Sequence, residues 1–272
     1  MVIWALGMGM ILLAGVLWLK QKFIFILGLV IVVVHNLLAP LSFGNSGFVS
    51  LLWYTLHQSG TVVLTDTFGI RVHYPILPMF GLICIGYGMG SLFTYEKKEE
   101  RISIFKKLSG ILLLLFVSLR LLNEYGDPGV WVHHEYFCRT VFSFLNVTKY
   151  PMSLDYILIT FAGAFCFITY VEKHTHKLWD YLAVFGKVSM SFYLGHLFLI
   201  HGLAVLLVGV LHYDSIHTHM TLLEWKTLKE NYGYSLVVVY IIWLSILGIL
   251  YLLCKKHRTL KSKYPNSFLK FI

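Results

Sequence analysis

The sequence predicts an all-α fold, a polytopic transmembrane helical bundle of about seven spans. Two compositional observations predict it: 58% of the 272 residues are hydrophobic and only 13% are charged. That charged fraction is about half of what a soluble domain carries. The third observation is that several apolar runs reach the roughly 20 residues that cross a bilayer core. The alternation of apolar and polar residues that is typical of a membrane β-barrel is not found.

Each expected span is an apolar run bounded by polar or charged residues. The fourth run is short and is expected to extend into its flanks. Residues 48–64 are also apolar, but His57, Gln58 and Gly60 interrupt them, so a re-entrant or interfacial segment is expected there. A single transmembrane domain is expected over residues 1–254, before a basic cytoplasmic tail at 255–272. The seven expected spans are residues 2–19, 23–41, 75–95, 109–122, 153–171, 182–211 and 234–254.

The basic residues indicate the orientation of the chain. Lysine and arginine gather after the first, third, fifth and seventh expected spans, whereas the alternate loops carry few of them and most of the acids. Cytoplasmic loops carry the excess of lysine and arginine. The N-terminus is therefore expected outside and the C-terminus in the cytoplasm. This placement also explains the net charge of +9, and no aromatic-basic pattern indicates a nucleic-acid partner.

No metal site is expected. The four cysteines show no CxxC or other metal spacing. The histidine groups at 133–134, 174–176 and 212–219 lie in loops on different sides, without acid or thiol ligands in a recognised spacing.

Polar residues gather where several expected spans meet the outer face. Ionisable groups at membrane depth are costly and usually face a bundle interior or a cavity. The outer loops NEYGDPGVW and FLNVTKYPMSLDY add more polar residues to this face. An alternative is that His35 and Asn36 make only interhelical hydrogen bonds, and that Arg120 extends to the interface. The residues concerned are His35, Asn36, Arg120, Asn123, Asp127, Lys149 and Tyr150.

The sixth expected span carries a second set of polar residues. Ser189, Tyr193 and His196 fall within about 60° of one another on a helix, with His196 near mid-membrane. Lys187 lies near the cytoplasmic end, on a different face. This stripe indicates a functional lining, although Ser189 and Tyr193 would serve equally as packing residues.

Six motifs in a fixed order carry a resemblance to a known family. They are IWALGMGMILLAG, HNLLAP, YPILPMFGLICIGYGMG, LRLLNEYGDPGVW, FLNVTKYPMSLDYILITFAG and FGKVSMSFYLGHLFLIH. Over Ile3 to His201 the chain resembles the bacterial branch of the heparan-alpha-glucosaminide N-acetyltransferase-like membrane acyltransferases. The pairing of YGDP with TKYP-x-SL is the most specific part of this resemblance.

The resemblance implies transfer of an acyl group, typically acetyl, from cytoplasmic acyl-CoA to an amine or hydroxyl, usually on a sugar, at the outer face. It also implies that the membrane is a bacterial inner membrane. Acetyl-CoA would be a co-substrate, with no permanently bound cofactor. His196 is the expected general base, with His35 second, because histidine titrates near neutral pH. The expected partners are the bilayer, acyl-CoA and a saccharide-like acceptor, and a homo-oligomer stays open. The expected acyl-CoA contacts are Lys187, Ser189 and Tyr193, and the acceptor contacts are Asn36, Arg120, Asn123, Asp127, Lys149 and Tyr150.

Two departures from the family pattern leave other functions open. The family begins with an Asp-x-x-Arg-Gly-like motif and further spans, which the chain lacks, so an N-terminal truncation of about three spans is expected. Lys187 stands where arginine is usual and keeps the charge but loses the bidentate fork. The alternatives are a small-solute transporter or flippase without acyl chemistry, and an inactive truncated remnant.

Overall fold

The computed structural model describes residues 2–65, 68–211 and 234–267. The chain divides into two compact units, Met1–His174 and Thr175–Ile272. Helices make up most of both units, so the expected helical class is confirmed.

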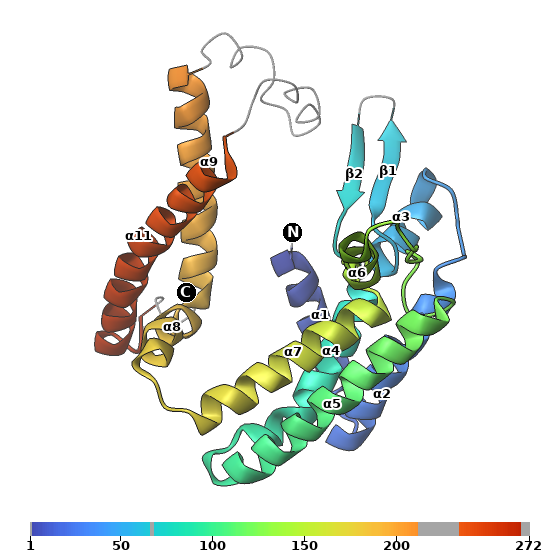
Figure 1. Cartoon of the computed structure of the whole chain (residues 1–272), viewed down its shortest axis with the longest axis horizontal. Helices are drawn as coiled ribbons and strands as arrows, with labels where there is room; N and C mark the ends of the chain where they lie inside the picture. Colours follow the sequence, from blue (N-terminus) through green and yellow to red (C-terminus); the bar gives the residue numbers. More distant parts are fainter. Residues whose placement is uncertain (1, 66–67, 212–233, 268–272) are drawn as a thin grey trace. The chain divides into compact units, whose positions relative to one another are not determined.

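The long helices of the first unit pack mainly in two groups, one of three helices and one of two (Figure 1). Helix α4 packs against α1 and α2, and α5 packs against α7. The α2–α4 contact is close because both helices present a glycine: a Cβ at Gly28 would lie 2.6 Å from the carbonyl oxygen of Gly81. The elements are α1 (Val2–Val16), α2 (Gln21–Val34) with η1 (His35–Leu38), α4 (Ile76–Met89) with η2 (Gly90–Phe93), η3 (Tyr95–Lys97), α5 (Lys98–Leu122) and α7 (Leu154–Lys173).

Three shorter elements gather at one end of these helices (Figure 1). They are α3 (Gly47–Leu56), the antiparallel hairpin of β1 (Gly60–Thr65) and β2 (Phe68–Val72), and α6 (Phe137–Leu145). The hairpin is an exception to the all-α expectation, and the run at 48–64 divides into α3 and most of β1. The β-branched residues of TVVLT favour a strand.

The second unit contains α8 (Lys177–Lys187), α9 (Ser189–Leu211) and α11 (Leu236–Lys263). Helix α11 contacts both α8 and α9, and Val184, Val188 and Cys254 form the buried centre of the unit. The expected sixth span, 182–211, is therefore not one helix. Val188 has φ −135° and ψ 46°, outside the helical region, and separates α8 from α9.

Six helices in the described parts of the chain are long and apolar enough to cross a membrane. Helix α1, with 15 residues, is shorter than the roughly 20 that a span needs. The fourth expected span extends as far back as Lys98, so the charged run before it is helical. The six are Gln21–Leu38, Ile76–Phe93, Lys98–Leu122, Leu154–Lys173, Ser189–Leu207 and Leu236–Lys263.

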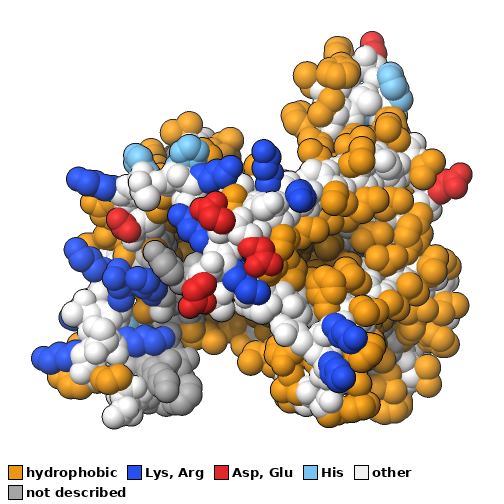
Figure 2. All heavy atoms as spheres, turned by 90° about the horizontal axis from the view of Figure 1, so that it is seen from below, with side chains coloured by type: hydrophobic (Ala, Val, Ile, Leu, Met, Phe, Trp, Pro, Cys, Tyr) orange, Lys and Arg blue, Asp and Glu red, His pale blue; other side chains and the backbone are white. Residues whose placement is uncertain are grey.

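Apolar side chains are widely exposed on these helices. In the apolar stretch of α9 no residue is buried within the chain, and in that of α11 only 11% of the residues are buried. Figure 2 shows hydrophobic side chains over much of the visible face, with charged side chains gathered in patches. Large exposed apolar surfaces are typical of sites covered by lipid or by another protein. The chain therefore has the features of an integral membrane protein, and its orientation stays a prediction.

Candidate functional site

Arg120 is the central side chain of the polar end of the first unit. It lies in the last turn of α5, is 2% exposed, and donates hydrogen bonds to four backbone carbonyl oxygens. Nε donates to Phe144 O at 2.9 Å and Nη1 to Gly129 O at 2.8 Å. Nη2 donates to Asn146 O at 2.9 Å and to Ser143 O at 3.3 Å. The guanidinium thus fixes the loop after α5 and the end of α6, and does not reach the surface.

Asp155 supplies the charge that faces Arg120. It lies in the first turn of α7, 1% exposed, with Oδ2 3.9 Å from Arg120 Nε. Its carboxylate oxygens accept no hydrogen bond from the described part of the chain. Gly126 lies against this carboxylate with φ +106°, and a side chain there would collide with it. The sequence analysis did not select Asp155, because a carboxylate beside a helix start reads as an ordinary first-turn acid.

Asp127 joins the two outer-loop motifs. Its Oδ1 accepts from Gly129 N at 2.7 Å and from Thr148 Oγ1 at 2.8 Å. Its Oδ2 accepts from Thr148 N and from Ser153 Oγ, both at 2.6 Å. Ser153 also caps α7 by accepting from Tyr156 N. The YGDP and TKYPMS motifs are therefore parts of one folded rim, with the Asp127 carboxylate turned inward.

His35 and Asn36 connect α2 with the same rim. Both ring nitrogens of His35 lie 2.8 Å from carbonyl oxygens, Nδ1 from Val32 O and Nε2 from Met152 O. Asn36 Nδ2 donates to Gly126 O at 2.7 Å. Because His35 is 2% exposed and both nitrogens face the backbone, its ring is not open to a substrate in this arrangement.

Asn123 ends α5 in the left-handed conformation, with φ 56°. Its side chain donates to Trp131 O and accepts from Trp131 N, each at 3.0 Å. Trp131 Nε1 in turn donates to Arg120 O at 2.6 Å. Asn123 therefore holds together the two ends of the loop between residues 123 and 131.

Lys149 and Tyr150 are the exposed members of the predicted acceptor set. Tyr150 OH lies 3.1 Å from Tyr74 OH, and Lys149 Nζ lies 5.2 Å from the centre of the Tyr150 ring. The hydrogen bond with Tyr74 and the Lys149 ammonium lower the pKa of Tyr150. The Tyr150 hydroxyl in turn raises the pKa of Lys149. The Tyr150–Pro151 peptide bond is cis.

A hollow of about 320 Å³ lies beside the rim. Asn36 and Asp127, both predicted acceptor residues, belong to its lining. Glu124 also lines it and is a carboxylate that the sequence analysis did not select. The lining is mostly apolar, and its few polar side chains, Glu124 among them, can accept hydrogen bonds from hydroxyl or amine groups. The other lining residues are Ala39, Pro40, Tyr125, Gly126 and Pro128.

The predicted acyl-CoA residues and His196 belong to the second unit. His196 Nδ1 lies 3.2 Å from Phe192 O, and the His196 ring lies 5.3 Å from that of Tyr193, edge to face. The structure thus brings Tyr193 and His196 together on α9. Ser189 is exposed at the first turn of α9, while Lys187 is exposed at the end of α8, a different helix.

The second unit also contains a serine–histidine pair that the sequence analysis missed. Ser191 Oγ is hydrogen-bonded to His257 Nδ1, which joins α9 to α11. His257 Nε2 is buried and has no partner in the described residues. The two residues are 66 positions apart, so no local pattern indicates them.

No protein-family model, no curated protein and no solved structure matches the chain. The resemblance set out above therefore stays a prediction. Among the residues that the structure describes, no three histidine, cysteine, aspartate or glutamate side chains come together as metal ligands would.

Proposed function

We propose that the chain is an integral membrane acyltransferase. It moves an acyl group, acetyl above all, from cytoplasmic acyl-CoA to an amine or hydroxyl of a saccharide-like acceptor at the outer face. The observation that supports this most is the hydrogen bonding of Asp127 to Thr148 and Ser153. These bonds join the YGDP and TKYPMS motifs, on which the resemblance depends most, into one folded rim, and a hollow lies beside this rim.

On the acceptor side, the contacts divide the predicted residues into two groups. Arg120, Asn123 and Asp127 bond to the backbone or side chains of the rim, so we assign them a positioning role. Asn36, Lys149 and Tyr150 lie at the hollow or on the exposed rim and are the proposed acceptor contacts, with Glu124 added. Hydroxyl and amide groups of this kind fix the orientation of a sugar.

On the donor side, His196 is the proposed general base. A carbonyl oxygen only accepts hydrogen bonds, so the contact with Phe192 O places the hydrogen on Nδ1 and the lone pair on Nε2. Nε2 would remove the proton from the acceptor as its nitrogen or oxygen attacks the thioester carbonyl. The carbon–sulfur bond then breaks, and coenzyme A leaves as the thiolate and is protonated. Lys187, exposed at the end of α8, is the proposed phosphate contact.

The test is acyl transfer by the purified chain in lipid nanodiscs. Radiolabelled acetyl-CoA is supplied with a panel of amino sugars, and labelled product is counted. We expect transfer by the unaltered chain, its loss in His196→Ala, and its retention in His201→Ala, a matched histidine on the same helix. Loss in both variants alike, or in neither, would remove His196 from the mechanism.

The two alternatives give different results when the purified chain is reconstituted into sealed lipid vesicles. Uptake of a solute into vesicles without consumption of acyl-CoA would favour a transporter or flippase. The absence of both acyl transfer and solute uptake would favour an inactive remnant.

A further inference from the structure

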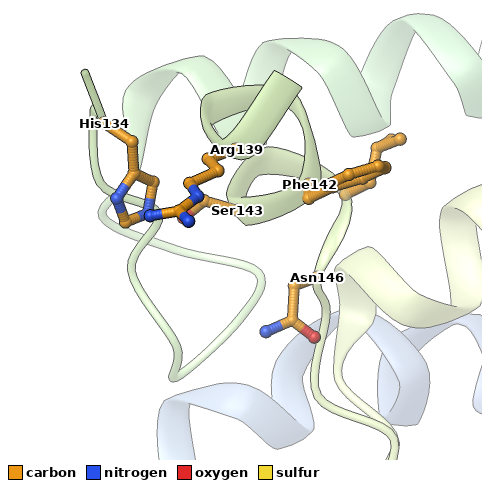
Figure 3. A pocket seen from close by; sticks show the side chains of 6 residues that line it. His134, Arg139, Phe142, Ser143 and Asn146 are labelled. Carbon is orange, nitrogen blue, oxygen red and sulfur yellow. The ribbon is translucent and has the colours of Figure 1, made fainter. Parts of the chain in front are cut away.

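A second pocket, an open hollow of about 560 Å³, lies against α6 and the residues that flank it, and is not used by the proposed reaction. Figure 3 shows the side chains of His134 and Arg139 beside one another, with the Asn146 amide facing the same space. Phe142 and Leu145 provide an apolar side. The pocket thus combines a cationic and hydrogen-bonding side with an apolar side.

Arg139 has no acidic partner in the described part of the chain. Two other arginines of the first unit do have partners: Arg101 is paired with Glu172, and Arg120 is buried in the rim. The guanidinium of Arg139 contacts only the Tyr136 ring, 5.4 Å from its centre. A planar guanidinium with free N–H groups matches a carboxylate or phosphate in two-point contact.

The apolar side of the pocket belongs to an exposed helix face. Phe142 is 70% exposed, Leu145 50% and Phe137 80%. Helix α6 connects the loop after α5 with the loop before α7, and in the predicted orientation it lies at the outer membrane surface. A short amphipathic helix with aromatic residues is typical of the headgroup region. An anion that carries an apolar chain would therefore contact both sides of the pocket at once.

The pocket is held in place before a ligand arrives. Arg120 bonds to the carbonyl oxygens of Ser143 and Asn146, and Thr140 Oγ1 accepts from His134 N at 2.9 Å and donates to His134 O at 3.2 Å. These bonds fix both ends of α6. A site that is ordered in advance loses less entropy when it binds.

We propose that this pocket binds the phosphate or carboxylate headgroup of an anionic amphiphile. Arg139 makes the charged contact, His134 and Asn146 provide further hydrogen bonds, and Phe142 and Leu145 contact the apolar chain. The proposal does not depend on acyl transfer, since it needs only the charge and the exposed apolar face of α6. A soluble anion could offer the same headgroup, so the test distinguishes a lipid from a free phosphate.

The test is native mass spectrometry of the full chain in detergent, titrated with phosphatidylglycerol or phosphatidylcholine. We expect Arg139→Gln to weaken phosphatidylglycerol binding about tenfold or more, because it removes a charge-assisted hydrogen-bond donor. The matched control, Arg71→Gln on the exposed β2, should leave binding unchanged. Phosphatidylcholine should bind weakly to all three proteins.

A second titration uses glycerophosphoglycerol, the deacylated phosphodiester of phosphatidylglycerol, which has the headgroup charge but no acyl chain. The lipid proposal predicts that this soluble anion binds much more weakly than phosphatidylglycerol, and that Phe142→Ser weakens only the lipid. Equal affinity for both would assign the pocket to soluble anions and overturn the lipid part. Absence of binding, or equal effects of Arg139→Gln and Arg71→Gln, would overturn the site altogether.

Discussion

Arg120 Nε lies 3.9 Å from Asp155 Oδ2, and both side chains are almost fully buried. The arginine bonds to four carbonyl oxygens of the rim, whereas the carboxylate bonds to nothing else in the described residues. The ion pair therefore links α5 to α7, and removal of either partner leaves an uncompensated buried charge.

The first prediction concerns this pair. Arg120→Met should lower the free energy of unfolding by about 3–5 kcal/mol, because the Asp155 charge and the rim carbonyls lose their partner. Asp155→Asn should cost less, since the hydrogen bonds of Arg120 to the backbone remain. Thermal unfolding in detergent measures both. Arg71→Met, at an exposed strand position, is the control and should change stability by less than about 0.5 kcal/mol. A similar result for Arg120→Met and Arg71→Met would contradict the structural role.

The second prediction concerns Asp127. Three of its four hydrogen bonds, from Thr148 and Ser153, join the YGDP and TKYPMS motifs, and the fourth comes from Gly129 N in its own loop. Asp127→Ala should release the segment 146–153 and lower stability by about 2 kcal/mol or more, because bonds to a charged group contribute about 1.5–3 kcal/mol each. Limited proteolysis should cut this segment faster in Asp127→Ala than in Glu135→Ala, an exposed acid of the same outer loop. Equal cutting rates would mean that the rim does not depend on Asp127.

The third prediction is a pH dependence at His57, which lies outside the six candidate spans. Burial lowers the pKa of His57 below its ordinary value near 6.5 and outweighs the hydrogen bond to the His35 backbone, which raises it; the charge of His35 lowers it by the smallest amount. Its Nε2 donates to His35 O at 2.6 Å, and its buried Nδ1 has no partner in the described residues. Above about pH 6.5 both folded and unfolded chains hold His57 neutral. As the pH falls below that value the unfolded chain takes up the proton first, so stability decreases.

The measurement is the unfolding midpoint between pH 8 and pH 5.5 for the unaltered chain and for His57→Gln. The variant should lose part of the decrease seen on acidification, because glutamine does not titrate. Identical pH profiles for the two proteins would show that His57 does not contribute.

The fourth prediction concerns the α2–α4 contact. Gly28→Ala should be destabilising by about 1–3 kcal/mol, because the new Cβ would lie 2.6 Å from Gly81 O, which is backbone and cannot move aside alone. Gly86→Ala is the control within α4, where no atom lies within 4 Å of the added Cβ. Alanine is the better helix former there, so this variant should be neutral or stabilising. Loss of stability in Gly86→Ala alone would contradict the packing argument.

Run length and charge placement predict the long helices, because a span requires a minimum number of apolar residues whatever its neighbours are. They do not separate α8 from α9, since neither proline nor a polar run stands at Val188. They also miss the hairpin, because TVVLT is as apolar as a membrane segment and its strand partner lies beyond it in the sequence.

The candidate site, like the fold, is predicted only in part from the sequence. The residue types that the sequence predicts at one membrane face do gather at one end of the first unit, as His35, Asn36, Arg120 and Asp127 illustrate. Their partners could not be predicted, because Arg120 and His35 bond to backbone carbonyl oxygens, which every residue offers. A residue type indicates the charge of a side chain, whereas its role depends on what faces it.

The dependence of the rim on backbone carbonyls has an evolutionary consequence. The oxygens that Arg120 holds belong to Gly129, Ser143, Phe144 and Asn146, and they stay in place when the attached side chains change. The pocket lining can therefore vary at Asn146 without loss of this support, whereas the Ser143 side chain also accepts a hydrogen bond from Val132 N at 3.0 Å. Position 120 itself cannot vary in this way, since lysine offers a single ammonium instead of a planar fork. An arginine kept at position 120 would thus let the side chains around it change on an unchanged backbone.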